Sequence, residues 1–335
     1  MPENRQVVIA SLPTGALAES DFELQTVGVP EPGPGQVLCR TLAVSVSAGS
    51  RAGLQGSASY AGAPKTGIVM SSLAVARVER SNDPALSPGD VVTCGAGWQD
   101  WSVHPAQQCF RVEGSADPAR YLGVLGTNGL TAYFGLLEVG EPKPGDTVVV
   151  SAAAGSVGHL VGQIARIQGC RVVGVAGSDE KCQRLVAELG FDAAVSHRSP
   201  DFRQEFKAAC GDGIDVYFDN TGGDVLGAAL FRMRNGGRIA CCGVVSQYDT
   251  SKPAPGPRGV PGLLVNKRLR MQGFLVFDWA QRYGEARAQL ESWLDSGELV
   301  AWQDEFEGLE SAPRALVDLL AGGNVGTRIV RVSPG

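Results

Sequence analysis

The sequence predicts an α/β protein that combines a doubly wound parallel sheet with a separate β-rich domain. Three observations support this prediction. The first third of the chain holds strand-like runs separated by proline-glycine turns. From about residue 124 to residue 300, strand signals alternate with helical patterns, which is the order that builds a parallel sheet. Between two of these strands, a glycine-rich turn leads directly into a helix.

Residues 1–123 are expected to form the β-rich domain. Gln36 to Ser45 and Val91 to Cys94 are strand-like runs, and turns at Pro32–Gly35 and Ser87–Asp90 separate such runs. The high glycine and alanine content of Ala48 to Ala63 favours a mobile loop over a cleft.

Residues 124–298 are expected to form the second domain, with six strands. These are Thr147–Ser151, Arg171–Ala176, Ala193–Ser196, Val216–Asn220, Arg238–Cys242 and Arg270–Val276. The last segment, residues 299–335, carries a predicted helix at Ala312–Ala321 and a closing strand at Thr327–Val332. We expect it to return to the first domain.

The turn after Thr147–Ser151 follows the pattern G-x-G-x-x-G, with Ala153, Gly155 and Gly158 at the three glycine positions. Gly155 keeps side-chain bulk away from a pyrophosphate, Gly158 lets helix and strand pack closely, and Ala153 fits if its φ stays negative. The helix predicted at Val157–Gln168 points its amino terminus at the phosphates. Strand, turn, helix and second strand fall within about 30 residues, which predicts a dinucleotide site.

The end of the second strand distinguishes NAD from NADP. An NAD-binding fold usually keeps an acidic residue there for the ribose hydroxyls. This chain has Gly177 and Ser178, followed by Asp179, Glu180 and Lys181. Ser178 and Lys181 could meet a 2′-phosphate, so NADP(H) is the predicted cofactor. The alternative is that Lys181 is only a solvated surface residue.

Composition and charge exclude several classes of protein. The net charge of -6 and the lack of a basic patch argue against a nucleic-acid partner. No signal peptide is evident, and no apolar run approaches the 18 or so residues of a membrane span. A cytoplasmic location is therefore expected. Eight cysteines without an export signal are expected to be reduced thiols.

No metal site is predicted. The cysteines are scattered apart from adjacent Cys241 and Cys242, and no C-x-x-C pair exists. The three histidines, His104, His159 and His197, have no partner at the spacing of a known catalytic motif. The same scarcity argues against a Ser-His-Asp hydrolase.

Several motifs point together to one family. They are GTNGLTAY at 126–133, KPGD at 143–146, AAAGSVG at 152–158, GSDEK at 177–181, FDNTGG at 218–223, CGVVSQY at 242–248, LRMQGF at 269–274 and GNVG at 323–326. In this combination the chain resembles the zinc-independent medium-chain dehydrogenases/reductases. More narrowly, it resembles their prostaglandin reductase and 2-alkenal (double-bond) reductase branch.

The resemblance implies a Rossmann doubly wound sheet plus a β-rich GroES-like catalytic domain. It also implies metal-free, NADPH-dependent reduction of the carbon–carbon double bond of an α,β-unsaturated ketone or aldehyde. Hydride would reach the β-carbon, and hydrogen-bond donors would stabilise the charge on the carbonyl oxygen. Relatives are commonly homodimers that pair the edges of their sheets, and Arg270–Val276 could supply that edge.

Cofactor contacts also follow from the resemblance. Ser178 and Lys181 would hold the adenosine phosphate, and Asn220 and Gly243 would line the groove. The full implied cofactor-binding set is Asn128, Thr131, Ala153, Gly155, Ser156, Val157, Gly158, Ser178, Lys181, His197, Asn220, Cys242, Gly243, Tyr248, Phe274, Val276 and Asn324.

At the other end of the cofactor, the resemblance implies that Phe274 to Val276 pack along the nicotinamide and that Asn324 binds its carboxamide. Tyr248 matches a cofactor-contacting tyrosine of the family. His197 stands where relatives often carry a tyrosine against the cofactor, although it could be only a surface residue.

Three candidate catalytic residues follow, Tyr248, Asn266 and Arg51. Asn266 replaces a tyrosine that the family places against the enolate oxygen. An amide donates a hydrogen bond but delivers no proton, so Tyr248, the ribose hydroxyl or water would protonate the product. Alternatively, Asn266 only caps a turn. Arg51 is the one residue of a family Asp-Pro-x-Met-Arg-Gly motif that Ser47–Ala52 keeps. It could recognise a carboxylate or phosphate, or be solvated.

The substrate pocket is the least determined part. Tyr60, Trp98, Trp101 and Tyr133 could form an apolar wall or belong to the core. Two other functions stay open: an NADPH-dependent quinone or carbonyl oxidoreductase, and a non-catalytic NADPH-binding protein.

Overall fold

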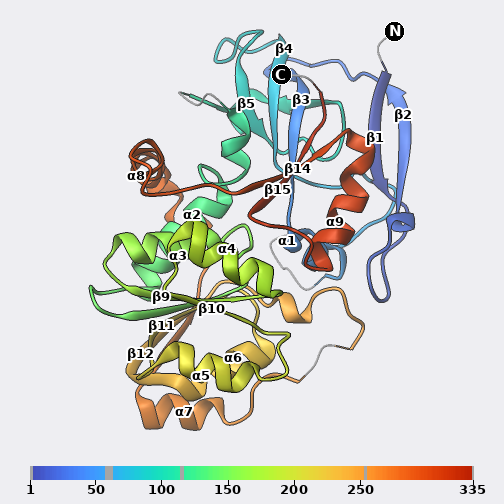
Figure 1. The fold of residues 1–335 in the computed structure, drawn as a ribbon. Coiled ribbons are helices and arrows are strands. Elements are labelled where there is room, and N and C mark those ends of the chain that lie inside the picture. Colours follow the sequence, from blue (N-terminus) through green and yellow to red (C-terminus); the bar gives the residue numbers. More distant parts are fainter. Residues whose placement is uncertain (1–2, 57–62, 114–116, 253–254, 334–335) are drawn as a thin grey trace.

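The computed structural model describes residues 3–56, 63–113, 117–252 and 255–333. It has a β-rich part that contains both ends of the chain and an α/β part formed by the middle (Figure 1). The predicted fold class is therefore confirmed. Tyr60 lies outside the described residues, as does part of the segment Ala48 to Ala63.

The β-rich part is built on a seven-stranded sheet and a two-stranded sheet. The larger sheet has, in spatial order, β14 (Gln303–Glu307), β15 (Thr327–Arg331), β3 (Gln36–Val46), β4 (Ala74–Ser81), β5 (Val91–Cys94) and β7 (Phe110–Arg111), with β6 (Trp101–Pro105) on β3. The smaller sheet pairs β1 (Glu3–Ile9) with β2 (Phe22–Gly28). Its helical elements are η1 (Glu19–Asp21), α1 (Ala48–Leu54), η3 (Ala106–Gln108), η4 (Pro118–Leu122), η8 (Leu309–Ser311) and α9 (Ala312–Leu320).

The α/β part holds a six-stranded parallel sheet. The spatial order is β10 (Ala193–Ser196), β9 (Arg171–Ala176), β8 (Thr147–Ser151), β11 (Ile214–Asp219), β12 (Met233–Cys241) and β13 (Arg270–Gly273). Its helices are α2 (Thr127–Phe134), α3 (Gly158–Ile167), α4 (Asp179–Leu189), α5 (Phe202–Cys210), α6 (Gly223–Arg232), α7 (Val260–Lys267) and α8 (Tyr283–Asp295). Shorter helical turns are η5 (Gly135–Gly140), η6 (Val245–Gln247) and η7 (Val276–Arg282). This order reverses direction between β8 and β11, the switch point at which such sheets bind dinucleotides.

All six predicted strands of this sheet are present, and three have different bounds. β11 runs from Ile214 to Asp219 rather than from Val216 to Asn220. β12 begins at Met233 rather than Arg238. β13 ends at Gly273 because the chain turns into η7, where Asp278 accepts a hydrogen bond from the Leu275 amide at 3.4 Å. In the first domain, the expectation of a loop from Ala48 is wrong for Ala48–Leu54, which is the helix α1.

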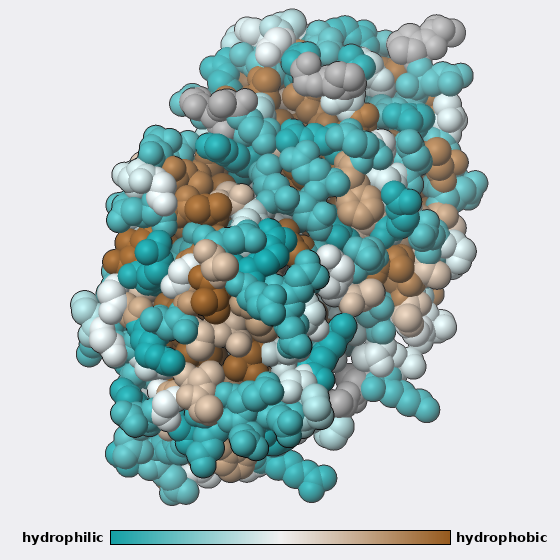
Figure 2. Space-filling view, in the orientation of Figure 1, coloured by the Kyte–Doolittle hydropathy of each residue, from teal (hydrophilic) through white to brown (hydrophobic). Residues whose placement is uncertain are grey.

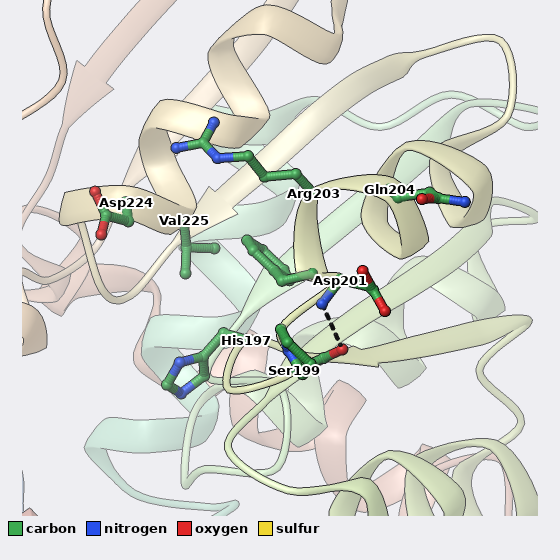
Figure 3. A pocket seen from close by; sticks show the side chains of 9 residues that line it. His197, Ser199, Asp201, Arg203, Gln204, Asp224 and Val225 are labelled. Atoms are coloured by element: carbon green, nitrogen blue, oxygen red, sulfur yellow. Dashed lines mark hydrogen bonds between the residues drawn. The ribbon is translucent and has the colours of Figure 1, made fainter.

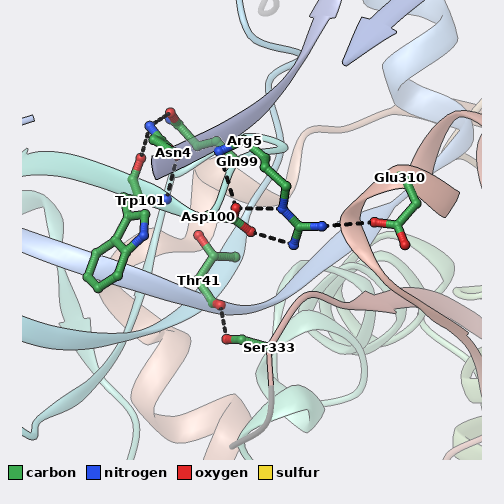
Figure 4. A network of polar contacts seen from close by, with 8 residues as sticks. All are labelled: Asn4, Arg5, Thr41, Gln99, Asp100, Trp101, Glu310 and Ser333. Carbon is green, nitrogen blue, oxygen red and sulfur yellow. Dashed lines mark hydrogen bonds and ion pairs between the residues drawn. The ribbon is translucent and has the colours of Figure 1, made fainter. Parts of the chain in front are cut away.

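The C-terminal segment joins the first domain, since β14 and β15 extend its sheet. A polar network adds to this link (Figure 4). Arg5 bonds Asp100 at 2.8 Å and Glu310 at 3.2 Å, and the Ser333 hydroxyl donates to the Thr41 carbonyl at 2.6 Å. The residue boundaries at 123/124 and 298/299 stay a prediction.

The candidate aromatic residues do not form one wall. Trp98 is fully buried in the β-rich core, where it packs 5.4 Å from Phe22. Tyr133 belongs to the core of the other domain and lies 6.0 Å from Trp293. The face shown in Figure 2 is mostly hydrophilic, with apolar patches between the hydrophilic side chains. Across the described residues, no helix has the length and apolar character needed to cross a membrane.

Candidate functional site

The predicted cofactor residues gather at one edge of the parallel sheet. Parallel strands place their carboxyl ends together, and open α/β sheets bind ligands at that edge. Each strand is followed there by predicted residues: Ala153 to Gly158 after β8, Ser178 and Lys181 after β9, His197 after β10, Asn220 after β11, Cys242, Gly243 and Tyr248 after β12, and Phe274 and Val276 after β13. Their roles stay predictions, but their common location is a property of the fold.

The glycine turn is tight in the predicted place. A Cβ atom on Gly158 would lie 2.3 Å from the Ala152 carbonyl oxygen, so only glycine lets α3 start this close to β8. Ala152 rather than Ala153 absorbs the strained turn, with φ of +47°. Gly155 bridges to Gly326, and the Gly326 amide donates to the Ala154 carbonyl at 2.8 Å. The turn is therefore held between the sheet and the C-terminal segment.

His159 connects α3 to that segment. The Trp302 amide donates to His159 Nε2 at 3.2 Å, so the ring proton sits on Nδ1, which lies 2.8 Å from the Gly155 carbonyl. Burial lowers the pKa of His159 to about 4, although the bond to Gly155 opposes the shift. His159 is therefore a neutral structural residue behind the glycine turn.

The switch point is organised by buried polar groups. The Ser151 hydroxyl accepts from the Asn220 amide at 2.8 Å, and the Asn220 side chain donates to the Ser151 carbonyl at 2.7 Å. Asp219 accepts from the Gly222 amide at 2.8 Å and from the Tyr217 hydroxyl at 3.1 Å. Burial raises the pKa of Asp219, and these donors counteract the rise. Asn220 is thus fixed at the end of β11.

Positive charge collects at the end of β9 and β10. Lys181 Nζ donates to the carbonyls of Gly322 and Asn324, both at 2.6 Å, which leaves its third proton for a ligand. Burial lowers the pKa of Lys181, and the charge of nearby Arg198 lowers it further. Sequence reasoning missed Arg198, although a basic residue directly after His197 at a strand end was a usable signal. Two cations and the Ser178 hydroxyl fit a 2′-phosphate.

The predicted roles of Lys181 and Asn324 exclude each other. The Asn324 carbonyl contacts Lys181, and Gly326, two residues on, pairs with the glycine turn. The 2′-phosphate and the carboxamide are at opposite ends of an extended dinucleotide, so Lys181 and Asn324 cannot take these two roles together. If Lys181 holds the 2′-phosphate, Asn324 belongs to the phosphate half of the site, and both roles stay predictions.

Phe274 and Val276 are packed into the core. A Cβ on Gly135 would lie 2.2 Å from the Phe274 ring, and Val276 is 6% exposed. A cofactor contact from this segment would therefore involve its backbone. Asn128 and Thr131 are half-buried on α2, and the Asn128 side chain donates to the Leu122 carbonyl at 3.4 Å.

Arg51 is neither solvated nor freely available to a substrate. Its side chain is 2% exposed, and its Nε pairs with Asp249 at 3.0 Å while Nη2 donates to the Gly15 carbonyl at 2.6 Å. Asp249 also accepts from the Leu17 amide at 2.6 Å. Because Asp249 follows Tyr248, this ion pair joins α1 of the first domain to the Tyr248 loop of the second.

Asn266 lies at the wrong edge of the sheet for catalysis within the same chain. The next residue, Lys267, donates to the carbonyls of Phe231 and Met233, both at 2.8 Å. Met233 begins β12, so this contact marks the amino edge. The exposed Asn266 precedes β13 at the same edge, opposite the cofactor residues. The expectation that Asn266 touches the reacting oxygen is therefore contradicted within one chain.

A pocket of about 450 Å³ opens beside His197 (Figure 3). The loop after β10 and the first turn of α5, from Ser199 to Gln204, line one side, and Asp224 and Val225 at the start of α6 line the other. The volume falls in the range of small-molecule pockets. It lies at the same end of the cofactor edge as Arg198.

Both parts of the chain match known protein families. A family profile described as zinc-binding dehydrogenase matches residues 156–292, and one described as the N-terminal domain of oxidoreductase matches residues 5–112. The crystal structure of CurA in complex with NADPH from Vibrio vulnificus has 38% identity and a TM-score of 0.95, and covers 99% of this chain and 100% of that chain.

Two curated relatives extend over nearly the full length. The NADPH-dependent curcumin reductase of Escherichia coli is 40% identical, covering 98% of this chain and 97% of the relative. The NADP-dependent 2-alkenal reductase of Nicotiana tabacum is 41% identical, covering 98% of both. The chain therefore belongs to the medium-chain dehydrogenase/reductase family, in the branch of the curcumin, 2-alkenal and prostaglandin reductases.

Proposed function

We propose that this protein uses NADPH to reduce the carbon–carbon double bond of an α,β-unsaturated ketone or aldehyde. The observation that carries the choice of NADPH is the pair of cations Lys181, after β9, and Arg198, after β10. An NAD-binding fold would carry an acid after β9. The names of relatives at 40% and 41% identity support the same reaction.

In this reaction NADPH supplies the hydride for the β-carbon. The chain's own residues bind and orient the partners. Lys181, Arg198 and the Ser178 hydroxyl hold the 2′-phosphate, and the amino terminus of α3 faces the pyrophosphate. The pocket beside His197 receives the adenine. Tyr248, which follows η6 in the segment after β12, lies on the nicotinamide side and is the candidate donor to the carbonyl oxygen.

Tyr248 is placed by the contact between the domains. Asp249 is its neighbour in sequence and is anchored by Arg51 and by the Leu17 amide. A hydroxyl that stabilises developing negative charge must be held in position before the reaction, because reorganisation during the reaction costs rate. Arg51 therefore acts as a positioning residue, not as a group that touches the substrate.

The chemistry of the site is proposed to be metal-free. Among the described residues, the His197 imidazole, the Cys242 thiol and the Asp219 carboxylate at the carboxyl edge do not converge as a group of metal ligands. The amides, hydroxyls and cations of this edge suit nucleotide binding and stabilisation of an oxyanion. Dialysis against a chelator should leave turnover of a small enone unchanged in protein that is still folded by circular dichroism. Loss of turnover that added zinc restores would contradict this part of the proposal.

Cofactor choice gives the sharpest test of the proposal. Lys181→Ala should raise the KM for NADPH by roughly 10- to 100-fold, since a charge-assisted hydrogen bond is worth about 1.5–3 kcal/mol. The KM for NADH should stay within about twofold. The matched control is Lys207→Ala, which removes an exposed lysine on α5. Equal losses for both cofactors would refute the assignment.

Substrate class is tested by NADPH consumption with a panel of enones, quinones and secondary alcohols. Turnover with enones and formation of the saturated ketone are expected. Reaction only with quinones or alcohols would replace the proposal by the oxidoreductase alternative. NADPH binding without turnover on any member would favour a non-catalytic binding protein.

We also propose a homodimer and a cytoplasmic location. β13 is the last strand of the parallel sheet and its residues are largely exposed, so its edge is open to a second copy. Exposed apolar side chains flank it, with Val265 75% and Leu275 46% exposed. Light scattering should give a molar mass of twice the chain mass. Leu275→Glu should lower the measured mass towards that of a single chain. A monomeric wild type would refute the dimer.

A further inference from the structure

Three cysteines that are far apart in the sequence meet inside the β-rich domain. Cys39 lies in β3, Cys94 ends β5 and Cys109 sits between η3 and β7. All three are buried, and their Sγ atoms lie within 4.8 Å of one another. These cysteines are therefore scattered along the sequence but close together in the folded chain.

Strand pairing explains why the thiols converge. β5 and β7 pair Thr93 with Phe110, so one further step places Cys94 opposite Cys109. Cys39 is on β3, and β4 separates β3 from β5 in the sheet. The Cys39 thiol consequently meets the other two in the core of the β-rich domain, and not through direct pairing of β3 with β5 or β7.

His104 lies beside this cluster. β3 and β6 pair Cys39 with Ser102 and Val37 with His104. Opposite residues of an antiparallel pair point to the same face, as do residues two apart on one strand. His104 is therefore on the same face as Cys39, and its Nε2 lies 2.8 Å from the Ser102 hydroxyl.

We propose that Cys39, Cys94 and Cys109 bind a zinc ion as thiolates. The His104 imidazole is outside this group and contacts the Ser102 hydroxyl, so it must turn away from Ser102 to become the fourth ligand. Three cysteines and one histidine form a known tetrahedral ligand set for structural zinc. A Zn–S distance of about 2.3 Å places thiolates about 3.8 Å apart, so the cluster needs to contract by no more than about 1 Å.

Zinc entry and the accompanying proton release also fit the structure. The Cys109 thiol now donates to the Pro105 carbonyl at 3.8 Å, and metal binding replaces such thiol protons and releases them to solvent. Cys109 is 8% exposed and its neighbour Phe110 is 64% exposed, so the cluster lies close to the surface on that side.

The site is separate from the proposed catalytic chemistry. The cluster belongs to the core of the β-rich domain. The cofactor edge is the carboxyl edge of the parallel sheet, whose strands belong to the two other core clusters. The profile whose description mentions zinc matches residues 156–292 and contains none of the four ligands. Zinc here would tie β3, β5 and β6 together and act on stability.

The test is titration of the full-length protein, reduced and treated with chelator, with Co²⁺ and then Zn²⁺. One Co²⁺ per chain should give the thiolate charge-transfer and strong d–d absorption of a tetrahedral site, and Zn²⁺ should displace it. Zn²⁺ should also raise the thermal midpoint by several degrees. Cys109→Ala should lose the Co²⁺ spectrum and the shift. The matched control is Cys210→Ala, which removes a buried thiol of α5 outside the cluster.

A measurement on the unmodified protein covers the case in which a variant does not fold. Zn²⁺ should slow alkylation of Cys39, Cys94 and Cys109 at least tenfold in peptide maps and leave Cys170 unchanged. Absence of a tetrahedral Co²⁺ spectrum in the wild type, or equal alkylation with and without Zn²⁺, would overturn the proposal. So would an unchanged Co²⁺ spectrum in folded Cys109→Ala. None of these readouts depends on reductase turnover.

Discussion

His159 is expected to make the stability of this protein depend on pH in the range where few other groups titrate. Its ring is fully buried, and burial lowers its pKa from 6.5 to about 4. The folded state therefore keeps a neutral ring while the unfolded chain takes up a proton. The stabilisation is complete above about pH 6.5 and is lost as the pH falls towards 4.

The magnitude follows from these two pKa values. At 1.36 kcal/mol for each pH unit, the loss from this single group reaches about 2 kcal/mol at pH 5 and about 3 kcal/mol at pH 4. The assay is urea unfolding at fixed protein concentration, followed by tryptophan fluorescence between pH 7.5 and pH 5. At pH 5 most carboxylates are still ionised, so histidines dominate the slope.

His159→Gln isolates the contribution, because glutamine keeps an acceptor for the Trp302 amide and does not titrate. The variant should lose about 1 kcal/mol at pH 7.5 for the missing bond to Gly155. Its stability should then fall by about 2 kcal/mol less than that of the wild type by pH 5. Parallel curves for the two proteins would show that burial does not keep this ring neutral.

Three further substitutions test the turn and the contact between the domains. Ala152→Gly should raise the free energy of unfolding by about 1 kcal/mol, because a φ of +47° is strained for alanine, and an unchanged urea midpoint would refute this. Gly158→Ala should lower stability by about 2–3 kcal/mol and weaken NADPH binding measured by calorimetry, because its Cβ would meet the Ala152 carbonyl. Asp249→Asn should lower the free energy of unfolding by about 3 kcal/mol, because it leaves the Arg51 cation buried without a charge partner. It should also lower kcat more than it raises the KM for NADPH. An unchanged free energy of unfolding would count against the ion pair.

The parallel sheet could be predicted closely from the sequence. β8, β9 and β10 have the predicted bounds, because strands buried on both faces leave short runs of apolar residues between turns. The start of β12 could not be predicted in this way. Its residues 234–237 are Arg, Asn, Gly and Gly, and they lie in an irregularity of the sheet between the pairs Ile214–Met233 and Val216–Arg238. Pairing with β13 begins only at Arg238.

The candidate site was predictable where it depends on strand ends and unpredictable where it depends on contacts between distant segments. Asn266 shows the difference. A family motif gives the place of Asn266 in the sequence. The edge of the sheet at which it lies follows from the topology, since a residue that directly precedes a parallel strand lies at the amino edge of the sheet. Arg51 and Asn324 needed the fold itself, because Asp249 and Lys181, which contact them, are more than 140 residues away in sequence.

The C-terminal segment links cofactor binding to the arrangement of the domains. Gln163, one turn after His159 on α3, accepts from the Val300 amide at 2.8 Å and donates to its carbonyl at 2.9 Å. His159 and Gln163 therefore hold the chain just before β14, and Lys181 holds it again just before β15. Because β14 and β15 belong to the sheet of the first domain, a movement of that domain would pull directly on the glycine turn and on the phosphate-binding lysine. Opening of the cleft at this end would have to break several buried hydrogen bonds together. On the side of α1 and Tyr248, the described residues are joined by the Arg51–Asp249 pair and by the bond from the Leu17 amide to Asp249.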